Sequence, residues 1–365
     1  MTTRLKTIRP KKTRAKKALI AASICGLTAL VMTGCGNGSS SDSASPTPNG
    51  HAVVLVSGLA TQTPYTTPTQ ACKQGLAAGN SLTALRASLL SDGNQVFTAP
   101  AQTGTTQVTS TTGLGASSDC PTPLPATMTI NTTTGIDAGG ESLTRFLTYL
   151  NQTYHIDTVD FVGHSMGGLF ATAATKDVKA QNLPITIRSL TTLGTPWTGA
   201  YPADYAAGKL KMSACFNQPT CVQTLTDYKK LAQAQGAKGA ASAISSLALQ
   251  GKNGWTTQLG DTFKDIPVTL IGGNRFVHPG GSPQVWPNDS VVALNSALAS
   301  TLNDQAIPHR SCLSRPDVHT TGIAAALQLP WTYSITWDPQ VMTAVNNAVK
   351  DADNAMSTPN RQGCP

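Results

Sequence analysis

Outside its first residues, the sequence lacks an excess of either charge. The 365 residues carry a formal net charge of +8, from 26 Lys and Arg against 18 Asp and Glu. Eight of the 26 basic residues lie within residues 1–34, which contain no acidic residue, so the rest of the chain holds 18 basic and 18 acidic side chains. A neutral body lacks the basic surface on which nucleic-acid binding depends. We therefore expect no nucleic-acid partner.

Spacings that hold metal ions are also missing. The eight cysteines include no CxxC pair, and the six histidines form no closely spaced group. Zinc sites are usually built from such pairs, so we expect no metal and no cofactor.

No internal repeat is found in the sequence either. A chain that is 40% hydrophobic and 12% charged can bury a sizeable core, and we expect one domain with short appendages.

One apolar run follows the basic N-terminus. It extends from Ala18 to Met32, and its 15 residues are fewer than a membrane-spanning helix uses. We therefore predict that residues 1–34 are an export signal peptide. The run ends in "MTGC", which resembles a bacterial lipobox, with Met32 in place of the usual leucine. The resemblance implies a lipid on Cys35, with ordinary cleavage or an uncleaved anchor helix as the alternatives.

Residues 35–50 would connect this signal to the folded body. They are rich in Gly, Ser, Pro and Asn and contain almost no apolar side chain, a composition typical of a flexible tether. With lipid on Cys35, the tether would hold the body at a membrane surface. We expect an exported protein, either a lipoprotein on the extracellular face of a bacterial membrane or a secreted form.

Cysteine usage agrees with export. If Cys25 leaves with the signal and Cys35 carries lipid, six cysteines remain in the body. An even set in an exported chain predicts three disulfides. Six cysteines allow many connectivities, so order alone does not select one. The pairs that sequence order suggests are Cys72 with Cys120, Cys215 with Cys221, and Cys312 with Cys364.

From residue 51 onward, short apolar runs typical of strands alternate with segments in which apolar residues recur at helical spacing. Short runs typical of buried strands occupy Ala52–Gly58, Gln95–Ala101, Thr158–Gly163, Pro184–Pro196 and Ile266–Asn274. Between the strands, apolar residues recur at helical spacing, at Leu82, Leu85 and Leu89 and again at Leu143, Phe146, Leu147 and Leu150. This alternation predicts an α/β fold with a mainly parallel sheet covered by helices on both faces.

Residues 197–263 interrupt the alternation. They are poor in strand signals and rich in Ala, Gln, Lys and Gly, and Cys215 and Cys221 would staple a small loop inside them. We interpret them as a helical, lid-like insertion over the edge of the sheet. The predicted organisation is a signal peptide at 1–34, a tether at 35–50 and a folded domain at 51–365.

The stretch Gly163-His164-Ser165-Met166-Gly167 fits the pattern Gly-x-Ser-x-Gly. In this pattern a serine lies on a sharp turn between a strand and a helix, and glycines are needed because β-carbons would clash there. A predicted strand precedes the motif, and the small residues that follow it let a helix lie close to the sheet. A serine in a glycine turn can be purely structural, but this setting favours a nucleophile.

The stretch "VDFVGHSMGG" resembles the nucleophile elbow of α/β-hydrolases, in particular bacterial lipases and esterases. "VVLVSGLA" is similar to the family's first core strand and oxyanion loop, with Ser57 where the family has histidine. "LTTLGTPWTGA" is similar to its Gly-Thr-Pro-His-x-Gly segment, with Trp197 in the histidine position. The similarity extends from His51 to His319 and is specific mainly around Ser165. It implies an α/β-hydrolase fold.

A serine hydroxyl needs a base to take its proton and a carboxylate to hold that base. In this family the order along the chain is nucleophile, acid, histidine, so both partners follow Ser165. Asp289 is the candidate acid, because it follows a predicted strand and resembles the family's Asp-Gly-x-Val turn, with Ser290 in place of the glycine. Asp261 and Asp265 precede that strand, where a carboxylate more often caps or solvates a helix end.

Two histidines follow the candidate acid. His319 lies in a short polar segment before a helix-like run, as the family's histidine often does. His309 lies beside Cys312, where packing or surface exposure would explain it. We favour His319 as the base and keep His309 as the alternative. The resemblance also implies two backbone N–H donors for an oxyanion, from Leu59 and Met166.

These residues predict a serine hydrolase of carboxylic esters, a lipase or esterase, in which Ser165, His319 and Asp289 work through an acyl-enzyme. The expected partners are an ester or lipid substrate and, through the lipid anchor, a membrane surface. Transfer of the acyl group to a hydroxyl other than water would use the same residues. An inactive surface binding protein on the same scaffold is an alternative from another class, although the presence of Ser, Asp and His in the required order argues against it.

Overall fold

The computed structural model describes residues 50–72, 79–108, 120–236, 239–248, 254–356 and 362–365. The chain divides into two units, Met1–Pro46 and Thr47–Pro365, and all the described residues belong to the second. The predicted signal peptide, the predicted lipidation site Cys35 and nearly all of the tether therefore lie outside the described residues. Within the described ranges, no helix is long and apolar enough to cross a membrane.

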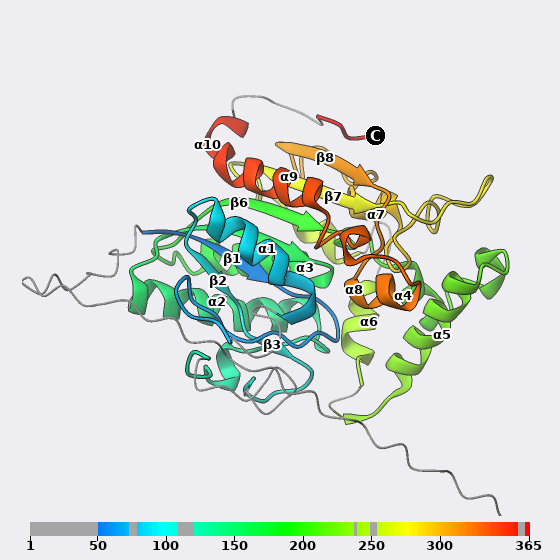
Figure 1. The fold of residues 1–365 in the computed structure, drawn as a ribbon, viewed down its shortest axis with the longest axis horizontal. Helices are drawn as coiled ribbons and strands as arrows, with labels where there is room; N and C mark the ends of the chain where they lie inside the picture. Colours follow the sequence, from blue (N-terminus) through cyan, green and yellow to red (C-terminus); the bar gives the residue numbers. More distant parts are fainter. Residues whose placement is uncertain (1–49, 73–78, 109–119, 237–238, 249–253, 357–361) are drawn as a thin grey trace, which may run out of the picture. The chain divides into compact units, whose positions relative to one another are not determined.

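A parallel sheet of six strands forms the centre of the second unit (Figure 1). Its strands are β1 (His51–Val56), β2 (Val96–Thr98), β5 (Thr158–His164), β6 (Thr186–Leu193), β7 (Val268–Gly273) and β8 (Arg310–Arg315). They lie in the order β2-β1-β5-β6-β7-β8, and every neighbouring pair is parallel. The predicted parallel sheet is confirmed. Because parallel strands end on the same side of a sheet, the loops that follow them meet there.

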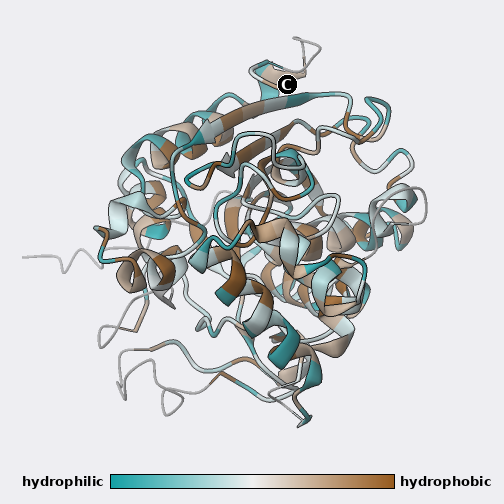
Figure 2. Ribbon diagram, turned by 90° about the vertical axis from the view of Figure 1, so that its right-hand side faces the viewer, coloured by the Kyte–Doolittle hydropathy of each residue, from teal (hydrophilic) through white to brown (hydrophobic). Residues whose placement is uncertain are grey.

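Helices cover both faces of this sheet, as the sequence predicts. Alternate residues of β1 enter two different core clusters, with Ala52, Val54 and Val56 in one and Val53 and Leu55 in the other. The first cluster is completed by α2 (Ile136–Tyr154) and α3 (Met166–Ala180), and the second by α1 (Gly79–Ser91) and α9 (Pro339–Lys350). Figure 2 shows hydrophobic residues concentrated toward the middle and hydrophilic ones toward the outside. Burial on both faces explains why β1 reads as a nearly continuous apolar run.

The structure departs from the sequence expectations at two strands. The segment Gln95–Ala101 is split, because Pro100 has no N–H to continue a ladder. After it, β3 (Ala101–Gln102) pairs with β4 (Ile130–Asn131) in a separate two-stranded sheet. The edge strand β8 has no strand signal in the sequence because its residues, RSCLSR, are mostly polar and only partly buried.

The segment 197–263 is helical where it is described, as predicted. Its helices are α4 (Tyr201–Ala206), α5 (Pro219–Gln233) and α6 (Ala241–Leu247), with 3-10 turns at Met212–Cys215 and Trp255–Gln258. The segment leaves the carboxyl end of β6, which lies between β5 and β7, so it begins at the middle of the sheet.

Short elements complete the domain. They are 3-10 turns at Ala126–Met128 and Trp331–Tyr333 and the helices α7 (Leu294–Ala297), α8 (Thr321–Ala326) and α10 (Ala352–Ala355). Three disulfides join Cys72 with Cys120, Cys215 with Cys221, and Cys312 with Cys364, the pairing that sequence order suggests. Disulfides in this number are typical of exported proteins.

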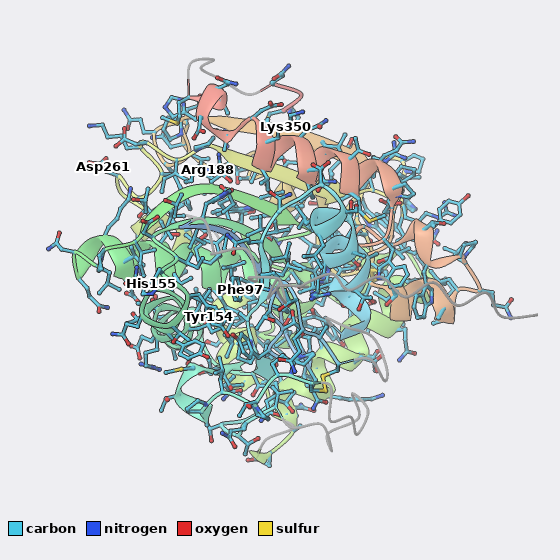
Figure 3. All side chains as sticks on the ribbon, turned by 60° about the vertical axis from the view of Figure 1, so that its left-hand side comes forward. Phe97, Tyr154, His155, Arg188, Asp261 and Lys350 are labelled. Atoms are coloured by element: carbon cyan, nitrogen blue, oxygen red, sulfur yellow. A yellow bond between two sulfur atoms is a disulfide. The ribbon has the colours of Figure 1, made fainter. Side chains whose placement is uncertain are left out.

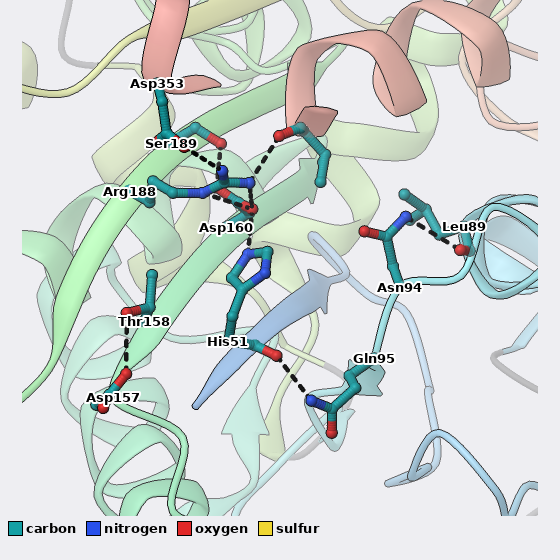
Figure 4. Close-up of polar contacts among 11 residues, drawn as sticks. His51, Leu89, Asn94, Gln95, Asp157, Thr158, Asp160, Arg188, Ser189 and Asp353 are labelled. Atoms are coloured by element: carbon teal, nitrogen blue, oxygen red, sulfur yellow. Dashed lines mark hydrogen bonds and ion pairs between the residues drawn. The ribbon is translucent and has the colours of Figure 1, made fainter. Parts of the chain in front are cut away.

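A buried carboxylate collects donors near the amino ends of the strands (Figure 4). Asp160 of β5 is fully buried and accepts hydrogen bonds from Arg188 Nη2, Ser189 Oγ and His51 Nε2, each at 2.6 Å. Arg188 also donates to Val349 O at 2.6 Å and pairs with Asp353 at 3.2 Å. A buried charge is tolerated only when it is paired in this way. The network joins β1, β5 and β6 to the C-terminal helices.

Asp160→Ala is expected to destabilise the fold strongly, because Arg188 and Ser189 would lose their buried partner. Removing one member of a buried ion pair costs about 3–5 kcal/mol, which urea unfolding of the disulfide-bonded protein would measure. Glu141→Ala is the control, because Glu141 is exposed and lies 3.9 Å from Arg145. The expected loss for that variant is below about 1 kcal/mol. Similar losses in the two variants would contradict the importance of the network.

Candidate active site

Ser165 occupies a strained turn between β5 and α3. Its backbone has φ 56° and ψ −134°, a combination that a residue with a β-carbon rarely adopts. The Ser165 N–H donates to Leu193 O at 2.8 Å, and the Ser165 carbonyl accepts from Thr195 Oγ1 at 2.8 Å. Bonds from the end of β6 therefore hold the turn. The serine side chain lies at the carboxyl ends of the strands.

The turn closes because glycines leave room around it. A β-carbon on Gly167 would lie 2.3 Å from Val56 O, and one on Gly168 would lie 2.2 Å from Thr195 Oγ1. After β1, a β-carbon on Gly58 would lie 2.7 Å from Met166 N. None of these separations is possible for a real side chain. The glycines therefore allow α3 to begin directly against the end of β1.

A side chain from the loop after β8 contacts the Ser165 hydroxyl, and a side chain from the loop after β7 contacts the first one in turn. His319 Nε2 lies 2.9 Å from Ser165 Oγ, and His319 Nδ1 lies 2.6 Å from Asp289 Oδ2. Ser165, His319 and Asp289 are 8%, 3% and 0% exposed, so water screens these contacts little. The structure thus brings the predicted nucleophile, base and acid into one continuous chain of hydrogen bonds. Such a chain can remove the proton of a serine hydroxyl and hold the resulting imidazolium.

Asp289 is oriented by its own loop. Its second oxygen, Oδ1, accepts the N–H groups of Val291 and Val292 at 2.9 and 2.7 Å. These bonds leave Oδ2 directed at His319. Gly194, with φ +57°, provides the space, because a β-carbon there would lie 2.9 Å from His319 Nδ1 and 3.0 Å from Asp289 Oδ2.

The alternative residues lie at the other end of the strands. Asp261 and Asp265 precede β7, and His309 immediately precedes β8. Figure 3 shows Asp261 on the same side of the molecule as His155, which follows α2 and precedes β5. Strands separate all three alternatives from the Ser165 hydroxyl. The structure therefore does not bring them to the candidate site.

The predicted oxyanion donors belong to segments in contact. Met166 is the first residue of α3, and the first N–H groups of a helix have no partner within it. Gly58, the residue before Leu59, packs against Met166 N. Ser57 Oγ accepts a hydrogen bond from Thr63 Oγ1 at 2.8 Å and so braces this loop. Trp197 is buried in the core, where its Nε1 donates to Thr192 Oγ1 at 3.2 Å.

A buried pair of carboxyl groups near His319 has no counterpart among the sequence predictions. Asp317 is 2% exposed and hydrogen-bonds Asp338. Asp338 also accepts from Gln340 N at 2.8 Å, as the N-cap of α9, and from Arg315 Nε at 2.9 Å. Burial, and then the charge and hydrogen bond of Asp338, raise the pKa of Asp317 to about 7. The two carboxyl groups therefore couple the segment that carries His319 to the start of α9.

His164 is the second feature that the sequence predictions did not include. Its Nε2 lies 2.9 Å from His319 O, so a residue of the serine motif contacts the main chain of the predicted base. Its place inside the motif was the available signal, but the partner is distant in sequence. Among the described residues, no three His, Cys, Asp or Glu side chains form a group that could hold a metal ion.

A family model described as "Alpha/beta hydrolase of unknown function (DUF915)" matches residues 93–257. Among solved structures, the chain is similar to the mature lipase BlEst2 of Bacillus licheniformis, with 14% identity, a TM-score of 0.41 and coverage of 76% of this chain and 89% of that chain. It is also similar to a thermophilic esterase of Thermogutta terrifontis, with 15% identity, a TM-score of 0.40 and coverage of 86% and 92%. A product of gene lin2722 of Listeria innocua shows 15% identity, a TM-score of 0.40 and coverage of 80% and 91%. No curated protein matches the sequence.

Asp317→Asn tests the raised pKa of this carboxyl group. A carboxyl group with a pKa of about 7 in the folded protein and 3.8 ordinarily binds its proton more tightly when folded. Its contribution to stability therefore falls as pH rises from about 4 to about 7. Asn donates an N–H to Asp338 at every pH, so the Tm of the variant relative to the wild type is expected to rise across that window. Thermal unfolding at a series of pH values measures this difference, and a constant difference would contradict the raised pKa.

Proposed function

We propose that this chain, a member of the α/β-hydrolase superfamily, is a serine hydrolase of carboxylic esters. The observation that carries the proposal is the chain of hydrogen bonds from Ser165 Oγ through the His319 ring to Asp289. Around it, the strained turn, the three loops at the carboxyl ends of parallel strands and the N-terminus of α3 all have the arrangement that acyl transfer requires.

In the proposed reaction, His319 Nε2 takes the proton of Ser165 as Oγ attacks the ester carbonyl. Asp289 accepts the Nδ1–H bond and stabilises the imidazolium that forms. The N–H groups of Met166 and Leu59 would face the developing oxyanion. His319 then gives the proton to the leaving alcohol, and water, activated by the same histidine, releases the acid from the acyl-enzyme.

Apolar residues next to the site support an ester with an apolar part. Val291, Val292 and Ala297 form a small buried cluster directly after Asp289. Tyr228 of α5 and Ile323 of α8 pack against it. The insertion at 197–263 therefore reaches the loop of the proposed acid, and we propose that it forms a wall or lid of the substrate site.

Ester hydrolysis is tested on the exported, disulfide-bonded protein with a fluorophosphonate probe and nitrophenyl esters of increasing acyl length. Ser165→Ala is expected to lower kcat by more than about a thousandfold and to abolish labelling. Asp289→Asn is expected to lower kcat by about a hundredfold or more, because the histidine loses its orientation. Absence of both labelling and cleavage in the wild type would contradict the proposal.

The identity of the base is tested separately. His319→Ala is expected to abolish turnover, whereas His309→Ala is expected to keep kcat within about twofold of the wild type because His309 lies at the amino end of β8. The opposite pattern would assign the base to His309. Adding glycerol to the assay and measuring the ratio of glycerol ester to free acid separates acyl transfer from hydrolysis.

We also propose that the chain is exported and lipidated on Cys35. The lipobox-like sequence and the three disulfides support this proposal. In a bacterial host, the wild type is expected to enter the detergent phase of a Triton X-114 extraction, whereas Cys35→Ser is expected to stay in the aqueous phase. If both proteins stay in the aqueous phase, the protein is not lipidated and the secreted form is supported instead.

A further inference from the structure

His164, the residue before Ser165, makes a contact that the proposed chemistry does not use. It is the last residue of β5 and is 1% exposed. Its Nε2 lies 2.9 Å from the main-chain carbonyl oxygen of His319. The two imidazole rings lie 4.8 Å apart, with 39° between their planes. Two adjacent residues, His164 and Ser165, therefore contact the backbone and the side chain of the same histidine.

The carbonyl partner determines which nitrogen of His164 carries hydrogen. A carbonyl oxygen only accepts, so Nε2 must be the donor and Nδ1 keeps a lone pair. Nδ1 is buried and has no hydrogen-bond partner among the described residues. Burial, and then the nearby His319, lower the pKa of His164 to about 3. The ring is therefore neutral near pH 7 and adds no repulsion when His319 becomes positively charged.

A buried nitrogen without a partner destabilises a folded protein, so packing alone would favour an apolar side chain at this position. The sheet order indicates what the histidine contributes instead. β6 and β7 lie between β5, which ends at His164, and β8, which precedes His319. The hydrogen bond from His164 to His319 therefore spans two intervening strands directly.

We propose that His164 is a positioning residue, which aligns His319 with Ser165 by holding the His319 carbonyl. The inference rests on the proposed function. The other end of His319 is also held, because its N–H donates to Asp289 O at 2.9 Å. The main chain of the base is thus fixed on both sides of its side chain. The distance from Ser165 Oγ to His319 Nε2 is then set by this direct hydrogen bond. Without the bond, it would depend on the relative positions of all four strands from β5 to β8.

Substitutions of similar volume separate this hydrogen bond from packing. Gln and Met have similar lengths, but only Gln carries an N–H donor that reaches the position of Nε2. His164→Met is expected to lower kcat about tenfold to a hundredfold with KM nearly unchanged, because small misplacements of catalytic groups have effects of that size. His164→Gln is expected to keep kcat within about threefold of the wild type. His309→Phe is the control for replacing a histidine away from the site.

Two readouts exclude a merely structural role. Each kcat is divided by the concentration of sites counted by end-point fluorophosphonate labelling, so unfolded protein does not lower the value. The acidic limb of the kcat/KM profile reports the base of the free enzyme. In His164→Met this limb is expected to move to lower pH, because a displaced His319 is less well stabilised by Asp289. His164→Gln is expected to restore it.

Equal kcat values for the wild type and His164→Met would overturn the inference, and so would equal losses in the Met and Gln variants. If His164→Met does not fold, His164→Asn replaces it, because the shorter amide cannot reach the carbonyl and the same loss is expected. Inactivity of the wild type toward the probe and all esters would instead remove the proposed function, and with it the role of His164.

Discussion

The site depends on one constraint, which is that the turn at Ser165 must touch the backbone that follows β1. No side chain fits between the two segments, because β-carbons on Gly58 and Gly167 would fall 2.7 Å from Met166 N and 2.3 Å from Val56 O. The close contact coincides with the φ of 56° at Ser165 and brings the start of α3 to the loop that contains Leu59. Strain of this kind persists only where the surrounding structure is rigid, and helices packed on both faces of the sheet provide that rigidity.

The parallel sheet brings together residues that are far apart in the sequence. The loops that contain Ser165, Asp289 and His319 follow β5, β7 and β8, and all of them leave the same side of the sheet. Hydrogen bonds between the loops then fix the positions of these loops relative to one another. His319 N–H is bound by Asp289 O, and the carbonyl of His319 is bound by His164. Hydrogen bonds to the main chain of His319 therefore connect the three loops, in addition to the side-chain contacts of the proposed reaction.

The sequence predicted the features that follow from local physics. Short runs rich in β-branched and apolar residues located β1, β5, β6 and β7, and the spacing of the motif glycines located the turn at Ser165. Strand β8 was not predicted, because its residues are mostly polar and only partly buried. The contact of His164 with His319 was not predicted, because the two residues lie 155 positions apart in the sequence. Hydrophobic periodicity carries no information about such a pair. The order of the strands was not predicted either, because the sequence pattern does not specify which strands are neighbours in the sheet.

The C-terminal residues lie along one edge of the sheet. β8 is an outermost strand, and such strands present unpaired N–H and C=O groups that can recruit a strand from another molecule. Here Cys312 N–H donates to Gln362 O at 2.8 Å, and the bond between Cys312 and Cys364 keeps that short segment alongside β8. The disulfide therefore keeps part of this edge covered. Reduction of this disulfide is expected to release the segment and so to expose backbone groups of β8 that a strand of another molecule could pair with.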